Sequence, residues 1–215
     1  MDEKDRGAAA LLAATAVNLP FGTLYAFSVF LKPVEALLGT TRAEMSFVFA
    51  LATVTLTAGM NVAAPLYRRL APVALASGCG VLSALGLFVA ATATSFAELA
   101  LGYGVLFGPG AGVLYILAQQ AVNQTVTRAR GLANGYVVSL YPLGAMLGAP
   151  LLGWAIAQFG VRAALAGLGA VVLLACAITA ALYRAAQMRM VDASAPAPAS
   201  REPLGAAFWR LAALF

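Results

Sequence analysis

Residues 131–153 read Gly131-Leu-Ala-Asn-Gly-Tyr-Val-Val-Ser-Leu-Tyr-Pro-Leu-Gly-Ala-Met-Leu-Gly-Ala-Pro-Leu-Leu-Gly153. They belong to an apolar run over 132–157, which is longer than the roughly 20 residues a helix needs to cross about 30 Å of hydrocarbon. Glycines recur along it, and small residues let the backbone of a neighbouring helix approach closely in lipid. The stretch therefore predicts a tightly packed transmembrane helix.

The rest of the chain has the same character. Of its 215 residues, 62% are hydrophobic and only 10% are charged, against roughly 45–50% and about 25% in soluble domains. The apolar runs are continuous rather than alternating, which favours helices over barrel strands. The sequence predicts an all-α membrane protein whose domain 1–190 holds six spans: 8–31, 43–66, 73–94, 96–121, 132–157 and 163–183.

The basic residues predict the orientation. With the N-terminus inside, the inner segments hold ten Lys and Arg and the outer loops hold three. Such an excess marks the cytoplasmic side, so both termini are expected in the cytoplasm and the protein in the cell (inner or plasma) membrane. The first run is longer than the core of a cleaved signal peptide, which favours a retained helix.

Two segments follow the sixth run. Residues 191–205 are rich in Pro and Ala and predict a cytoplasmic linker. Residues 206–215 are apolar again and too short to cross a bilayer. They are either an interfacial tail or the start of a seventh helix, and the second interpretation is favoured.

Several functions are disfavoured by what the sequence contains. The chain has no histidine, and Cys79 and Cys176 lie in apolar runs without a C-x-x-C spacing, so packing is the favoured role for both. The basic residues form no single patch for nucleic acid. We expect no enzyme activity, no cofactor and no metal site.

Glycines are densest in the fourth run. Gly104, Gly108, Gly110 and Gly112 flank Pro109, which predicts close helix packing and a kink. Packing alone explains this pattern. The alternative is a helix that flexes or lets substrate pass near its backbone.

The opening stretch also resembles a known family. The positions Gly135, Gly144, Gly148, Pro150 and Gly153 are similar to the fifth-helix motif G-x8-G-x3-G-P-x2-G of the major facilitator superfamily (MFS), with Ala149 inserted before the proline. The preceding turn, Arg130-Gly131-Leu-Ala-Asn-Gly135, resembles the family's R-G-x-A-x-G. The resemblance implies the N-terminal six-helix half of an MFS transporter.

The loop between the second and third runs matches the family less well. It reads Pro65-Leu-Tyr-Arg-Arg-Leu-Ala-Pro72, where Arg69 fits the family's G-x-x-x-D-R-x-G-R-R. Arg68 stands in place of the Asp and Ala71 in place of a Gly. By resemblance, the gating and conformational residues are Arg69, Arg130, Gly131, Gly144, Gly148 and Pro150.

Within the superfamily, three segments resemble the oxalate/formate antiporter and monocarboxylate transporter group: Gly22 to Phe30, Lys32-Pro33, and Thr41 to Ser46. This resemblance implies secondary transport of a small organic anion across the lipid bilayer. Alternating access would require a second six-helix half or self-association, and the cations that face the substrate would come from that second half.

Depth along the helices selects candidate substrate-binding residues. Asn18, Tyr115 and Tyr141 lie about 13–15 Å from the predicted inner ends, near the midplane, and Tyr25 lies about 25 Å up, where an outer gate would be. Packing or an interfacial belt is the alternative role for each tyrosine. No Asp, Glu, Lys or Arg lies at middle depth in any run.

A second class of function stays open. The chain would then be a truncated or accessory membrane protein without transport activity of its own. The lack of an intramembrane cation favours this alternative, whereas the midplane tyrosines favour transport.

Overall fold

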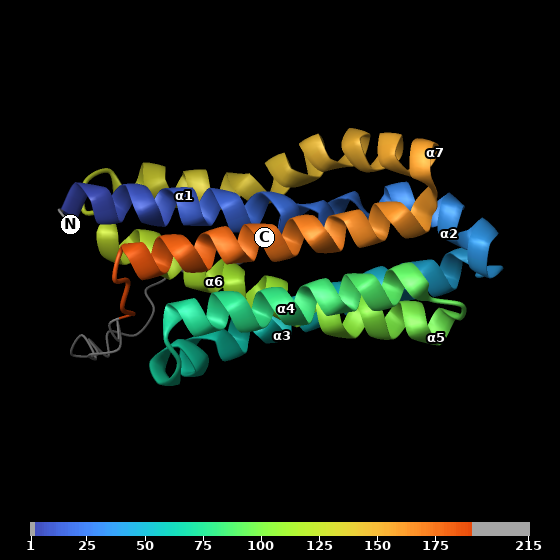
Figure 1. Cartoon of the computed structure of the whole chain (residues 1–215), viewed down its shortest axis with the longest axis horizontal. Helices are drawn as coiled ribbons and strands as arrows, with labels where there is room; N and C mark the ends of the chain where they lie inside the picture. The colour runs from blue at the N-terminus through green and yellow to red at the C-terminus, as the bar shows by residue number, and fades with distance from the viewer. Residues whose placement is uncertain (1–2, 191–215) are drawn as a thin grey trace, which may run out of the picture.

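The computed structural model describes residues 3–190, and all regular structure in that range is helical. The helices run roughly along the long axis of the molecule (Figure 1). Their bounds are α1 Glu3–Gly22, η1 Thr23–Phe30, α2 Leu31–Leu38, α3 Arg42–Arg69, α4 Pro72–Thr92, α5 Phe96–Leu99, η2 Ala100–Phe107, α6 Gly108–Thr125 and α7 Arg130–Ala185. The predicted linker, 191–205, and the segment 206–215, expected to be an interfacial tail or the start of a seventh helix, lie outside the described residues.

Five helical stretches of the described chain are long and apolar enough to cross a membrane. They are Lys4–Leu38, which joins α1, η1 and α2, then α3, α4, Phe96–Thr125, which joins α5, η2 and α6, and finally α7. The prediction of an all-helical membrane protein is confirmed at this level.

Helix α7 is broken at Gly160. As one straight helix, its 56 residues would be about 84 Å long, far more than the hydrocarbon thickness of about 30 Å. Gly160 instead has φ 82° and ψ 164°, a conformation that glycine adopts at little cost because it lacks Cβ. The chain turns back there, and Figure 1 shows the two arms of α7 running antiparallel.

Close packing of α6 against its neighbours depends on glycine. A Cβ atom on Gly112 would overlap the carbonyl oxygen of Leu56 on α3, and one on Gly110 would lie 2.7 Å from the carbonyl oxygen of Cys79 on α4. Backbones therefore touch on both sides of this helix. The close approach that the glycine pattern predicts is present.

The turns before Pro109 are wider than an α-helix. Segment η2 is a π-helix, in which each carbonyl accepts from the residue five positions later. For Gly104 that residue is Pro109, which has no N–H to donate. The Thr55 hydroxyl of α3 donates to the Gly104 carbonyl instead, at 2.6 Å, and the Ser83 hydroxyl of α4 donates to the Phe107 carbonyl at 3.0 Å.

We predict that Gly112→Ala lowers the stability of the purified chain by about 1–3 kcal/mol, because the added methyl group meets the α3 backbone. The matched control is Gly135→Ala, where a Cβ meets nothing within 4 Å and alanine is the better helix former. Thermal unfolding in a mild detergent measures both. Equal unfolding temperatures for the two variants would contradict the packing assignment.

Candidate functional site

Three tyrosines from three separate segments meet inside the bundle. Tyr25 lies on η1, Tyr115 on α6 and Tyr141 on the first arm of α7. The ring of Tyr141 packs edge-to-face on Tyr115, with centroids 5.0 Å apart, and on Tyr25 at 6.0 Å. The structure thus brings together three residues predicted as substrate ligands, including Tyr25, which the helical rise alone places further out.

The three rings differ in exposure. Tyr141 is only 4% exposed, whereas Tyr25 is 50% exposed and Tyr115 is partly buried. The Tyr141 hydroxyl is also engaged, because it donates to the carbonyl of Ala111 on α6 at 3.3 Å. Tyr141 therefore supports the other two rings, while Tyr25 and Tyr115 are the more exposed members of the cluster.

Asn18 lies on α1, two residues before the proline at position 20 of the same helix. It is 1% exposed, and both atoms of its side-chain amide lack a hydrogen-bond partner among the described residues. Leaving buried donors and acceptors unpaired costs free energy. No hydrogen bond joins Asn18 to the tyrosines, so the structure places it in the same bundle but not in the tyrosine cluster.

Backbone contacts between α1 and α7 fix the position of the cluster. A Cβ on Gly22 would overlap the carbonyl of Tyr141 itself, and one on Gly144 would overlap the carbonyl of Leu19. Gly148 sits against the Thr23 side chain, 2.6 Å from a Cβ built there. Two of the predicted conformational residues, Gly144 and Gly148, therefore contact the segments that carry Asn18 and Tyr25.

Pro150 lies in the same arm of α7, which curves away from α1 toward Gly160 (Figure 1). A cavity of about 550 Å³ opens between α1, η1 and the two arms, and its lining includes Leu19, Thr23 and Gly148.

The remaining predicted gating residues lie apart from the tyrosines. Arg130 begins α7 and is exposed. Gly131 has open space around it, so close packing does not require a glycine there. Arg69 ends α3 and lines a different cavity, of about 910 Å³.

Sequence reasoning missed two groups of residues near the cluster. The hydroxyls of Thr15 on α1 and Tyr136 on α7 form a hydrogen bond of 2.6 Å. An aromatic row extends inward from α1, where Phe21 stacks on Phe107 at 5.6 Å and Phe107 contacts Tyr103 at 5.2 Å. The sequence did contain a signal for Thr15 and Tyr136, since hydroxyl side chains within apolar runs commonly form hydrogen bonds with adjacent helices.

The part of the chain that the structure describes offers no obvious set of donor groups for a metal ion or a cofactor. Within residues 3–190, no group of three or more His, Cys, Asp or Glu could hold a metal ion. The tyrosine cluster offers hydroxyl donors and ring edges, which suit a small anion with an apolar part.

Comparison with known proteins gives the family. The family model of the Major Facilitator Superfamily matches residues 9–214. Because that match covers nearly the whole chain, the chain belongs to this superfamily. The predicted membership is confirmed, and together with the apolar helices it supports a multi-pass membrane protein of a transporter superfamily.

Individual relatives agree with the family. Monocarboxylate transporter 11 of Mus musculus is 33% identical over 162 residues, 75% of this chain and 36% of the relative. Monocarboxylate transporter 13 of Bos taurus is 29% identical over 68% of this chain and 34% of the relative. YhjX of Escherichia coli, named an uncharacterized MFS-type transporter, is 26% identical over 63% of this chain and 34% of its own length. The chain spans about a third of the length of these relatives.

We predict that Asn18→Leu raises the stability of the isolated chain by about 1–3 kcal/mol, because it replaces an unpaired buried amide with an apolar side chain of similar size. Chemical or thermal unfolding in detergent measures the change. The control is Asn61→Leu, since the exposed Asn61 amide donates to the Thr57 carbonyl at 2.8 Å. A loss of stability in Asn18→Leu would show that the amide makes a stabilising contact and contradict the prediction.

Proposed function

We propose that the chain forms the N-terminal half of a secondary transporter for a small organic anion of the oxalate, formate or monocarboxylate type. The observation that carries this proposal is the meeting of Tyr25, Tyr115 and Tyr141 in a chain of this superfamily. The names of the relatives, several of them monocarboxylate transporters, support the substrate class.

The tyrosines divide into two roles in this proposal. Tyr25 and Tyr115 donate hydrogen bonds from their hydroxyls to the carboxylate, and their ring faces contact its apolar part. Tyr141 positions both rings, because its own hydroxyl is held by Ala111. Asn18 supplies a further amide to substrate or to a neighbouring helix once the bundle changes conformation.

Alternating access completes the proposal. The two arms of α7 are counted as separate crossings, which gives a half-bundle of six spans with both termini in the cytoplasm of a cell membrane. This half rocks against a second six-helix half, or a second copy, around a site at the midplane. The parts that move or hold one conformation are the contacts of Gly144 and Gly148 with α1 and η1 and the bend at Pro150. The basic helix ends at Arg69 and at Arg130 and Gly131 belong to the same group.

The countercharge for the anion comes from the second half. The spans that carry the tyrosines contain no Asp, Glu, Lys or Arg at middle depth, and a bare carboxylate is costly in hydrocarbon. The same fact favours the alternative, an accessory membrane protein that does not transport by itself.

We predict that liposomes containing this chain alone take up no oxalate, formate or lactate, and that uptake requires a second six-helix half. In that assembly, Tyr115→Phe and Tyr25→Phe weaken substrate affinity by about tenfold each, the loss expected for one hydrogen bond to a charged group. Tyr141→Phe keeps its ring and has a smaller effect. Radiolabelled uptake and equilibrium binding are the measurements.

The matched control is Tyr103→Phe, whose fully buried hydroxyl lies outside the cluster and has no hydrogen-bond partner in the described part of the chain. Uptake by the chain alone would overturn the need for a second half. Unchanged affinity in both Tyr115→Phe and Tyr25→Phe would remove the assignment of the site. Absence of uptake in every combination would support the accessory protein.

A further inference from the structure

A second cavity lies at one end of the bundle, away from the tyrosines. It measures about 910 Å³ and is formed where α1 begins, α3 ends, α4 begins, α6 ends and α7 ends. Among the residues that the structure describes, five arginines line it and no Asp or Glu does: Arg6, Arg68, Arg69, Arg184 and Arg189. A cavity with this lining has a strongly positive potential, which attracts anions.

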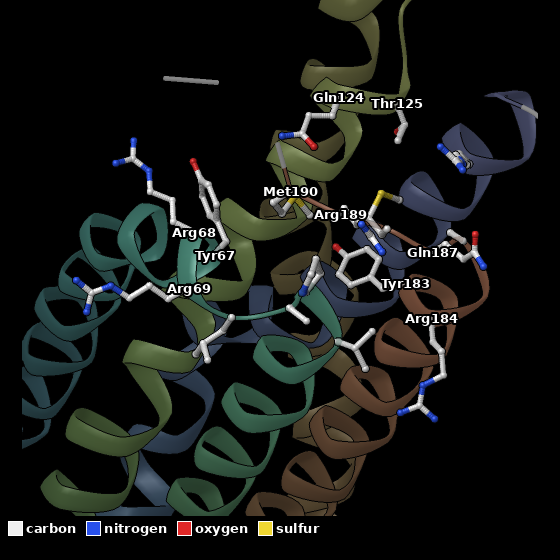
Figure 2. A pocket seen from close by; sticks show the side chains of 17 residues that line it. Tyr67, Arg68, Arg69, Gln124, Thr125, Tyr183, Arg184, Gln187, Arg189 and Met190 are labelled. Atoms are coloured by element: carbon white, nitrogen blue, oxygen red, sulfur yellow. The ribbon is translucent and has the colours of Figure 1, made fainter. Parts of the chain in front are cut away.

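The end of α7 brings one arginine into the middle of this cavity. Gln187 has a left-handed conformation, with φ 46°, and the Met188 N–H donates to the Tyr183 carbonyl at 2.9 Å. This pattern is a Schellman-type helix end, which reverses the chain. Figure 2 shows Arg189 beside Tyr183 near the middle of the cavity, whereas Arg68 and Arg69 extend outward from α3.

Two further features of the cavity are suited to an anion. Tyr183 lines it with a side chain that is 0% exposed, and the hydroxyl has no hydrogen-bond partner among the described residues. Helix α4 begins at the cavity with Ala71, which offers no side-chain cap. The first N–H groups of an uncapped helix carry a partial positive charge and commonly bind phosphate.

We propose that this cavity binds the phosphate group of an anionic membrane lipid. Arg189 and the Tyr183 hydroxyl would bind the phosphate oxygens directly, and the other arginines would supply the surrounding positive field. A lipid fits better than a soluble anion because the cavity lies among the termini of five helices. Helix termini of a membrane-spanning bundle lie at the depth of the lipid headgroups. Met188, Met190 and Leu70 provide apolar contacts for the rest of the lipid.

Binding of short-chain lipids to the full chain in a neutral detergent tests this proposal. The probes are dioctanoyl phosphatidylglycerol, dioctanoyl phosphatidylcholine and inorganic phosphate. Native mass spectrometry counts the bound lipids, and thermal unfolding measures stabilisation, which grows with ligand concentration over Kd. We expect phosphatidylglycerol to bind and stabilise the chain, and the other two probes to have little effect.

Variants localise the binding. Arg189→Gln weakens phosphatidylglycerol affinity about tenfold or more, and Tyr183→Phe weakens it severalfold without lowering the stability of the lipid-free chain, because its hydroxyl is unpaired there. Arg128→Gln is the matched control, since Arg128 is an exposed arginine that does not line this cavity. It removes the same charge and leaves the affinity unchanged.

Three outcomes would overturn the proposal. Equal binding of the two lipids, which share the phosphate but differ in net headgroup charge, would show that the anionic character of the lipid is not recognised. An equal loss in Arg128→Gln and Arg189→Gln would show attraction to general surface charge rather than to this cavity. Full stabilisation by inorganic phosphate alone would assign the cavity to a soluble anion and exclude the lipid.

Discussion

A backbone that crosses hydrocarbon must form all its hydrogen bonds within the protein. The carbonyl of Gly104 shows this constraint most directly, because its partner in the regular pattern is a proline. Pro109 cannot donate to it, so Thr55 of α3 does. Ser83 of α4 supplies the matching bond to Phe107. In water an unpaired carbonyl would bind solvent, but in the bilayer it must be paired within the protein. The irregular turn therefore forces α3, α4 and the segment η2–α6 to lie together.

The placement of the tyrosines follows from the packing around that turn. Once α6 is fixed by its glycines, Ala111 is in position to accept the Tyr141 hydroxyl. The other side of Tyr141 is set by α1, because Gly22 lies against the Tyr141 backbone. Ring geometry at the site is thus determined by these two backbone contacts of Tyr141 rather than by a network of charged groups.

Much of this arrangement is encoded in local sequence. Continuous apolar runs predicted the helical membrane fold, and the glycine pattern around Pro109 predicted where backbones touch. Depth arithmetic selected Tyr115 and Tyr141, which do contact each other. Depth arithmetic could not predict that Tyr25 contacts Tyr141, because this contact depends on the 3₁₀ helix η1 and on the length of the side chains. It also gave no sign of the cavity at Tyr183 and Arg189, which the reversal at Gln187 creates from distant residues.

The contact between Gly22 and Tyr141 ties the arrangement of the three tyrosine rings to the spacing of two helices. The same residue whose ring supports Tyr25 and Tyr115 also forms, through its main chain, the surface on which α1 rests. A shift of α1 relative to α7 therefore cannot leave the ring cluster unchanged. Because the cost of a side chain at position 22 is steric, a substitution there would change the distance between two helices, and with it the spacing of the three rings, while all three tyrosines stay the same.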